Sequence, residues 1–195
     1  MKQNEIIDFF NEMAPTWDAH TIRNEAAIRD ILDAGGVKAG VRVLDIACGT
    51  GVLFPDYLNR NVASVLGCDI SPEMLKIAKE NFKAEPSISY LCADAQTFSF
   101  SQVFDCIMIH NAFPHFAHPE LLFSNLSACL AAGGRLTVAH SMSREAIQNC
   151  HVGKPQHVSK PLPTATALAQ TMSEFLNVDV VVSDAQKYIV SGTRF

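Results

Sequence analysis

The chain has 195 residues, of which 48% are hydrophobic and 18% are charged, and its formal net charge is −5. This length suits one domain with a full hydrophobic core, and this composition excludes a disordered chain. The negative net charge and the lack of any cluster of lysine and arginine argue against a nucleic-acid partner.

The chain start, Met1 to Glu5, lacks the apolar stretch of a signal peptide, and no apolar run reaches membrane-spanning length. The six cysteines form no Cys-x-x-Cys pair, and most fall in expected strands or a helix, so we expect reduced core residues. These features predict a cytoplasmic protein with no integral membrane association. The sequence leaves a homodimer open.

Hydrophobic periodicity predicts a helix at 3–13, a break at Ala14-Pro15 and a second helix at 22–34. Strands and helices then alternate. The expected strands are 42–46, 64–69, 88–92, 104–109 and 134–140, and the expected helices are 52–60, 72–83 and 118–130. The end of the chain adds a helix at 164–176 and two strands, 178–184 and 187–194. The alternation predicts a parallel sheet with helices on both faces.

No linker or repeat divides the chain, so residues 1–195 are expected to form a single domain. Ligands of open α/β sheets bind beyond the carboxyl ends of the strands. The N-terminal helices, residues 1–35, would then form a lid over that edge. The segment 140–163, whose end carries three prolines, would complete the substrate pocket.

The segment Val43-Leu44-Asp45-Ile46-Ala47-Cys48-Gly49-Thr50-Gly51 is an apolar strand with an acid near its end, followed by a loop of small residues. Gly49 and Gly51 carry no Cβ, so the loop's backbone N–H groups can approach a ligand closely. A dinucleotide loop would have a third glycine where Phe54 stands. Asp45 is a poor neighbour for phosphate and a good one for an ammonium group. The motif therefore favours a ligand with an amino-acid head and a nucleoside tail, such as S-adenosylmethionine.

Two more acids each close an apolar run. Asp69 ends a predicted strand eighteen positions after Gly51, where a carboxylate can accept hydrogen bonds from a ribose diol. Asp94 ends the next predicted strand, where it can accept from an adenine amine beside the Ala95 backbone. A single acid of this kind is usually a helix cap or a solvated loop residue. Three in order favour one binding edge.

With these motifs the chain resembles the class I S-adenosylmethionine-dependent methyltransferases, especially the branch of ubiquinone and menaquinone biosynthesis enzymes and their small-molecule relatives. The resemblance covers roughly residues 5–140 and extends through 69–75, 94–95, 104–113 and 130–136. Ala47 stands where many members have glycine. The resemblance implies a Rossmann-like α/β fold, a doubly wound sheet of seven mostly parallel strands with a C-terminal antiparallel hairpin. It also implies methyl transfer to a small-molecule acceptor, for which a quinone-type ring is one candidate.

The resemblance also assigns the cofactor contacts. Asp45 and the Ala47–Gly51 backbone would hold the methionine end, Asp69 the ribose, and Asp94 with Ala95 the adenine. The whole predicted cofactor set is Asp45, Ala47, Cys48, Gly49, Gly51, Asp69, Ile70, Met74, Asp94, Ala95 and His110.

Histidines at or near the strand ends are the candidates for proton transfer, because methylation of a hydroxyl or a ring carbon requires removal of a proton. These catalytic candidates are His110, His115 and His140. The alternative role for His110 is a hydrogen bond to the loop backbone or to the cofactor carboxylate. The expected substrate-pocket residues are Trp17, Asn111, Phe113 and His151. Trp17 would be a mobile lid residue or, alternatively, a helix-packing aromatic.

The alternative to a histidine-lined substrate pocket is a metal site. The possible ligands are His110, His115, His118, His140, Cys150, His151 and His157. Their spacing matches no structural zinc site, so we predict no metal.

Other functions are disfavoured by particular residues or left open. The fourth strand ends His110-Asn111-Ala112-Phe113, which lacks the Asn/Asp-Pro-Pro-aromatic box of amine-methylating nucleic-acid enzymes. A nicotinamide-dependent oxidoreductase is disfavoured by Phe54 and Asp45. A non-catalytic or metal-linked sensor or scaffold on the same fold stays open, because cofactor motifs do not report turnover.

Overall fold

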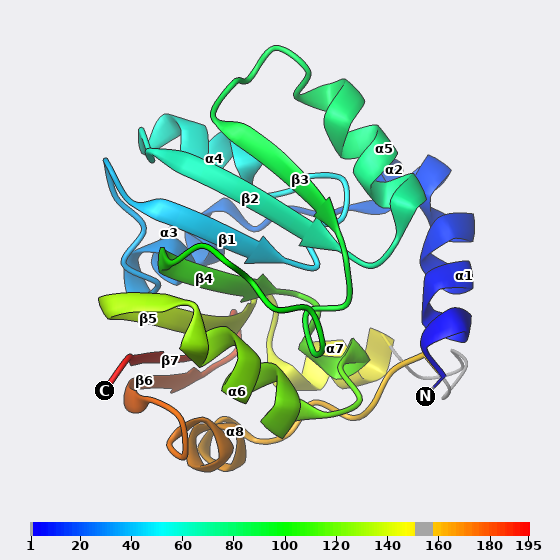
Figure 1. Cartoon of the computed structure of the whole chain (residues 1–195). Helices are drawn as coiled ribbons and strands as arrows, with labels where there is room; N and C mark the ends of the chain where they lie inside the picture. Colours follow the sequence, from blue (N-terminus) through cyan, green and yellow to red (C-terminus); the bar gives the residue numbers. More distant parts are fainter. Residues whose placement is uncertain (1, 151–157) are drawn as a thin grey trace.

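The computed structural model describes residues 2–150 and 158–195 and contains one seven-stranded sheet (Figure 1). The strands are β1 Arg42–Ile46, β2 Ser64–Asp69, β3 Ile88–Cys92, β4 Phe104–His110, β5 Leu130–His140, β6 Asn177–Ser183 and β7 Tyr188–Thr193. Their order in the sheet is β3-β2-β1-β4-β5-β7-β6. The first five are parallel, and β7 pairs antiparallel with both β5 and β6. The predicted fold class is confirmed.

Helices cover both faces of the sheet. They are α1 Gln3–Met13, α2 Trp17–His20, α3 Glu25–Ala34, α4 Phe54–Asn59, α5 Pro72–Asn81, α6 Pro119–Ala128, α7 Arg144–Cys150 and α8 Ala165–Met172. Figure 1 shows α6 in front of the sheet, α8 below β6, and α3 and α4 behind the sheet. Two buried apolar clusters match these layers, one joining the sheet to α6 and α8 and the other joining it to α3, α4 and α5. The hydrophobic effect on both faces therefore fixes the layered arrangement.

The helix α1 stands beyond the arrowhead ends of the central strands (Figure 1). The expected break at Ala14-Pro15 is not an extended linker. The chain continues through a 3-10 turn, Ala14–Thr16, directly into α2. Proline at the second position of that turn is tolerated because its missing N–H has no partner there.

The predicted helix 22–34 begins three residues later, at Glu25. Asn24 caps it by accepting a hydrogen bond from the Ala27 N–H at 3.2 Å, and Ile22 lies outside the helix, 92% exposed. Asn at this position stops the helix from extending towards the N-terminus, because its side chain takes an N–H that no helical carbonyl reaches. The helix α7 was not predicted, since it falls inside the segment expected to be the substrate-pocket region.

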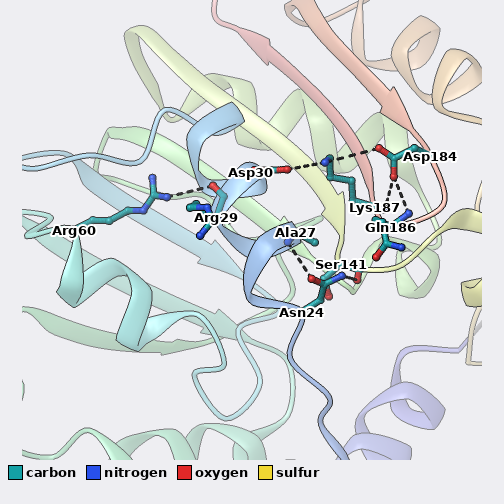
Figure 2. A network of polar contacts seen from close by, with 9 residues as sticks. All are labelled: Asn24, Ala27, Arg29, Asp30, Arg60, Ser141, Asp184, Gln186 and Lys187. Atoms are coloured by element: carbon teal, nitrogen blue, oxygen red, sulfur yellow. Dashed lines mark hydrogen bonds and ion pairs between the residues drawn. The ribbon is translucent and has the colours of Figure 1, made fainter.

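A network of polar contacts fixes α3 against the end of the sheet (Figure 2). The Lys187 ammonium group lies 2.6 Å from an Asp30 carboxylate oxygen, and Asp184 accepts backbone N–H bonds from Gln186 and Lys187 at 2.8 and 2.9 Å. The Asn24 amide also lies 3.5 Å from the Ser141 carbonyl oxygen, just beyond β5. These contacts hold the loop before α3 next to the carboxyl ends of β4 and β5.

None of the helices in the described part of the chain is long and apolar enough to cross a membrane.

Candidate functional site

A cavity of about 530 Å³ lies at the carboxyl ends of the parallel strands. It is bounded by the loops after β1 to β4 and by the N-terminal segment. The predicted site residues that line it are Trp17, Asp45, Ala47, Cys48, Gly49, Asp69, Ile70, Met74, Asp94, Ala95, His110, Asn111 and His115. Its size and its mixture of many apolar with few polar groups are typical of a small-molecule site.

The loop after β1 turns sharply through left-handed backbone. Ala47 has φ +55°, Gly49 +56° and Gly51 +88°. A Cβ at Gly51 would lie 2.6 Å from the Phe54 ring and 2.8 Å from the Phe82 ring. Gly51 therefore allows close packing inside the protein and does not itself line the cavity, and its predicted contact with the ligand stays a prediction.

The acid rim consists of Asp45, Asp69 and Asp94. Asp45 is only 2% exposed. Burial raises the pKa of its carboxyl to about 8, the charge of Asp69 acts in the same direction, and the Tyr57 hydroxyl opposes them. A buried carboxylate without a cation is costly, so Asp45 is suited to a positively charged ligand group.

Asp69 is held by the backbone on both sides. One carboxylate oxygen accepts the Gly49 N–H and the other accepts the Ser71 N–H, each at 2.8 Å. Burial raises the pKa of this carboxyl, and the backbone N–H groups counteract the rise. Ser71 in turn caps α5 and donates to the Asn11 side chain of α1 at 2.7 Å. A carboxylate fixed in this way keeps lone pairs for ligand hydroxyls.

Asp94 accepts from two glutamines. The Gln96 N–H and side-chain amide lie 2.9 and 3.1 Å from one oxygen, and the Gln3 amide of α1 lies 3.2 Å from the other. The first helix therefore closes the cavity at this end. Neither glutamine was predicted. In particular, nothing in the sequence around Gln3 indicates a contact with a residue ninety-one positions away.

The aromatic side of the cavity consists of Phe10, Trp17, His115 and Phe116. The Phe10 ring meets Trp17 edge to face at 5.8 Å and His115 at 4.9 Å. Trp17 thus both packs on α1 and lines the cavity. A further contact attaches the segment to the β1 loop, where the Thr50 hydroxyl donates to Asp18 at 2.5 Å.

Sequence reasoning missed much of this side. The cavity-lining residues outside the predicted set include Phe10, His20, Ile22, Phe116, His118 and Met142. The amphipathic pattern of 3–13 predicts that Phe10 is covered, but it does not say by which segment. No motif marks the others.

His110 ends β4 and lies on the cavity wall. Its Nε2 atom is buried and has no hydrogen-bond partner among the described residues. Burial, and secondarily the positive charge of Arg23, lowers the pKa of this imidazole to about 4. The ring is therefore neutral near pH 7. A bound ligand can supply the hydrogen-bond partner that the buried Nε2 atom does not find among the described residues.

His115 lies in the 3-10 turn Phe113–His115, and its Nδ1 atom is 2.7 Å from the Val158 carbonyl oxygen. Because a carbonyl oxygen only accepts, Nδ1 must carry the proton in this contact. The ring's other nitrogen is then the basic one in the neutral form.

Two further predicted residues, His140 and Phe113, do not line the cavity. His140 is 2% exposed and does not line the cavity, because β7 pairs with β5 to its last residue and Tyr188 meets His140 edge to face at 5.9 Å. Phe113 stacks on Phe123 in the core at 5.8 Å. Asn111 lines the cavity, but its amide connects to Ser141 through bonds of 3.0 and 3.1 Å. His151 lies outside the described residues.

The described residues contain no group of three or more His, Cys, Asp or Glu side chains arranged to hold a metal. His151 and His157, which the weighed metal set included, lie outside this part of the chain.

The sequence was also compared with those of known proteins. Residues 43–134 match the family described as a methyltransferase domain. The chain is 29% identical over 160 residues to a ubiquinone/menaquinone biosynthesis C-methyltransferase of Campylobacter jejuni, covering 74% of this chain and 66% of that protein. It is 36% identical over 137 residues to a demethylmenaquinone methyltransferase of Thermus thermophilus, covering 66% and 62%. The chain thus spans just under two thirds of these curated relatives.

Solved structures share the whole fold. The N-methyltransferase NodS of Bradyrhizobium japonicum, crystallised with S-adenosylhomocysteine, superposes with a TM-score of 0.76 at 16% identity over 100% of this chain and 99% of that one. A protein of Pyrococcus horikoshii superposes with a TM-score of 0.75 at 19% identity over 96% and 99%. At these identities the likeness concerns the fold.

Proposed function

Because the chain carries a methyltransferase domain on a class I methyltransferase fold and resembles quinone C-methyltransferases, we propose that it transfers a methyl group from S-adenosylmethionine to a small-molecule acceptor. The observation that carries the proposal is the acid rim. Three carboxyl groups at the strand ends line one cavity, and two of them, Asp45 and Asp69, are buried with no ion pair to a cation of the described residues.

Each part of the donor has a matching group on the rim. Asp45 would pair with the ammonium group, and the Ala47 to Gly49 backbone would border the methionine end. Asp69 would accept from the ribose hydroxyls, and Asp94 from the adenine amine. His110, whose buried nitrogen has no partner in the described chain, would bind the cofactor carboxylate or orient the acceptor. When bound, the cofactor supplies an electrophilic methyl group on a sulfonium sulfur.

The acceptor would bind between the acid rim and the aromatic side. No lysine or arginine of the described residues lines the cavity, which supports an uncharged acceptor over a phosphorylated one. The aromatic and aliphatic walls of this side, with Ile22 and Met142, would exclude water and bind a planar or apolar ring. We include a quinone-type ring in the proposal because the relatives named for quinone methylation support it.

The proposal also covers the cellular compartment of the protein and the domain organisation of the chain. The five cysteines with described side chains are unpaired thiols, which supports a reducing compartment, and we place the protein in the cytoplasm. The chain would work as a single domain with its lid in residues 1–35. Within this range α1 and α2 border the cavity, whereas α3 packs on the sheet. The net charge of −5 supports a small molecule over nucleic acid.

The proposal is tested by turnover. The purified protein is incubated with S-adenosylmethionine and a panel of hydroquinones, phenols, thiols and amines, and S-adenosylhomocysteine and methylated product are quantified by mass spectrometry. Formation of both in equal amounts supports the proposal. Tight cofactor binding with no product from any acceptor would favour the rival function, a cofactor-binding sensor or scaffold.

A further inference from the structure

The Asp94 carboxylate, just beyond β3, is surrounded by hydrogen-bond donors of the protein itself. Its Oδ1 atom accepts the Gln96 backbone N–H at 2.9 Å and the Gln96 side-chain amide at 3.1 Å. Its Oδ2 atom lies 3.3 Å from the same side-chain amide and accepts the Gln3 amide at 3.2 Å. A carboxylate offers about four lone-pair sites. Each oxygen thus already has two donors, so a ligand that donates to Asp94 must displace one of them.

The two glutamines are held to different degrees. The Gln96 side-chain oxygen accepts the His118 N–H at 2.8 Å, which fixes its amide nitrogen towards Asp94. Gln3 is exposed and lies at the start of α1, and among the described residues its side chain makes no hydrogen bond besides the one to Asp94. Both glutamines line the cavity. Gln3 is therefore the donor that a ligand releases at the lowest cost.

The rest of the N-terminal segment is attached independently of this carboxylate. The Asn11 side chain of α1 accepts the Ser71 hydroxyl at 2.7 Å, and the Asp18 carboxylate of α2 accepts the Thr50 hydroxyl at 2.5 Å. Neither contact uses a carboxylate of the acid rim. Release of the Gln3 side chain from Asp94 therefore leaves α1 and α2 attached to the loops after β2 and β1.

We propose that Gln3 is an internal substitute for the adenine amine of the cofactor. Its amide holds the place on Asp94 Oδ2 that this amine takes, and cofactor binding exchanges one donor for the other while α1 and α2 stay attached. The two donors are chemically alike, since each is an NH₂ group with two N–H donors. Gln96 is the positioning residue that keeps Asp94 oriented during the exchange. The inference rests on the proposed function, because adenine reaches Asp94 only as part of the cofactor.

The same substitution at the two glutamines is expected to act in opposite directions. Gln3→Met removes the competing donor and should tighten S-adenosylhomocysteine binding by about threefold to tenfold, the range of one net hydrogen bond. Gln96→Met removes the positioning donor and should weaken binding by about tenfold. Gln170→Met, at an exposed position of α8 outside the cavity, is the matched control and should change nothing. Weaker or unchanged binding by folded Gln3→Met would overturn the proposal.

The part played by the amine is tested with an analogue of S-adenosylhomocysteine whose purine carries hydrogen in place of the 6-amine. This analogue cannot displace Gln3 from Asp94, so wild type and Gln3→Met should bind it equally. Gln96→Met should lose less affinity for the analogue than for S-adenosylhomocysteine, a difference that a merely structural role of Gln96 would not produce. An equal gain for both ligands in Gln3→Met would show that the variant acts through α1 and not through Asp94, and would overturn the proposal.

The exchange itself is observed through the side-chain amide signal of Gln3 in protein labelled with ¹⁵N-glutamine, with Gln3→Met used to assign it. S-adenosylhomocysteine is expected to move this signal to the position of a solvated glutamine amide, and the amine-free analogue is not. Backbone amides at 11–18 should be equally protected from hydrogen exchange in both complexes. A Gln3 signal unchanged by bound S-adenosylhomocysteine would overturn this inference alone. Absence of S-adenosylhomocysteine binding to folded protein would overturn the proposed function, and the inference with it.

Discussion

The acid rim is built from consecutive strand ends, whereas the aromatic side is assembled from α1, α2 and the 113–117 turn, which are far apart in the sequence. On the rim, backbone N–H groups hold a side chain at fixed geometry, as with the two bonds to Asp69. On the aromatic side, the rings hold one another, and the Val158 carbonyl holds His115. The rim therefore suits an invariant ligand such as a cofactor, and the aromatic side suits a chain-specific acceptor.

The largest expected effect is a loss of turnover caused by a change on the aromatic side that leaves the acid rim intact. Changing His115 to alanine should lower turnover on the accepted substrate by about 10²–10⁴-fold, because general-base help is typically worth that factor. Affinity for S-adenosylhomocysteine should barely change. Steady-state kinetics and calorimetry separate the two effects.

The control for this change is His140→Ala. This residue is buried beside Tyr188 and away from the cavity, so the variant should keep turnover per folded molecule and lose only stability. A comparable loss of turnover in both variants would mean that the two histidines act through folding alone.

The second change breaks the rim. Asp69→Ala should weaken S-adenosylhomocysteine binding by about 1.5–3 kcal/mol, because charge-assisted hydrogen bonds to two hydroxyls are lost. Asp179→Ala, which removes a carboxylate paired with Arg135 at 2.6 Å outside the cavity, serves as the control. Unchanged affinity in a folded Asp69 variant would exclude a ribose role for this carboxylate.

A third prediction concerns pH and the buried acid of the rim. The folded-state pKa of Asp45, about 8, lies above the unfolded value, so this group favours folding at low pH and loses that contribution as pH rises towards 8. In Asp45→Asn this loss is absent. The free energy of unfolding of the wild type should therefore fall relative to the variant between pH 5 and pH 8, at most by about 1.4 kcal/mol per pH unit.

Denaturant titrations of both proteins across this range measure the difference. Parallel pH profiles would show that Asp45 is ionised in the free protein. S-adenosylhomocysteine should reverse the trend, because its ammonium group stabilises the ionised carboxyl.

The smallest expected effect sharpens the account of the β1 loop. Ala47 has φ +55°, a conformation that costs an L-residue more than glycine. Ala47→Gly should stabilise the protein by about 0.5–1 kcal/mol after the entropy cost of glycine in the unfolded chain is subtracted. Asn61→Gly, at φ +54° in a turn that does not line the cavity, should gain less because asparagine tolerates this region. Thermal denaturation compares the two.

The same contrast explains what could be predicted from sequence. The rim residues follow apolar runs, and parallel strands bring their carboxyl ends to one edge, so Asp45, Asp69 and Asp94 follow from local patterns. The distribution of helices over the two faces follows for the same reason. These features depend on periodicity within a short stretch of chain.

The aromatic side could not be predicted in this way. The contact between Gln3 and Asp94 and that between His115 and Val158 join segments with no pattern in common. His140 shows the opposite error. A strand end is open only if its neighbour stops short, and β7 continues alongside β5 to His140. How far two neighbouring strands stay paired towards their ends cannot be predicted from their residues alone.

The central claim is that the acid rim holds S-adenosylmethionine, and its most direct test is a calorimetric titration of the free protein with S-adenosylhomocysteine and, separately, with NAD. We expect S-adenosylhomocysteine to bind with a dissociation constant in the micromolar range and NAD to show no comparable binding. A preference for NAD, or no heat from S-adenosylhomocysteine with folded protein, would contradict the account.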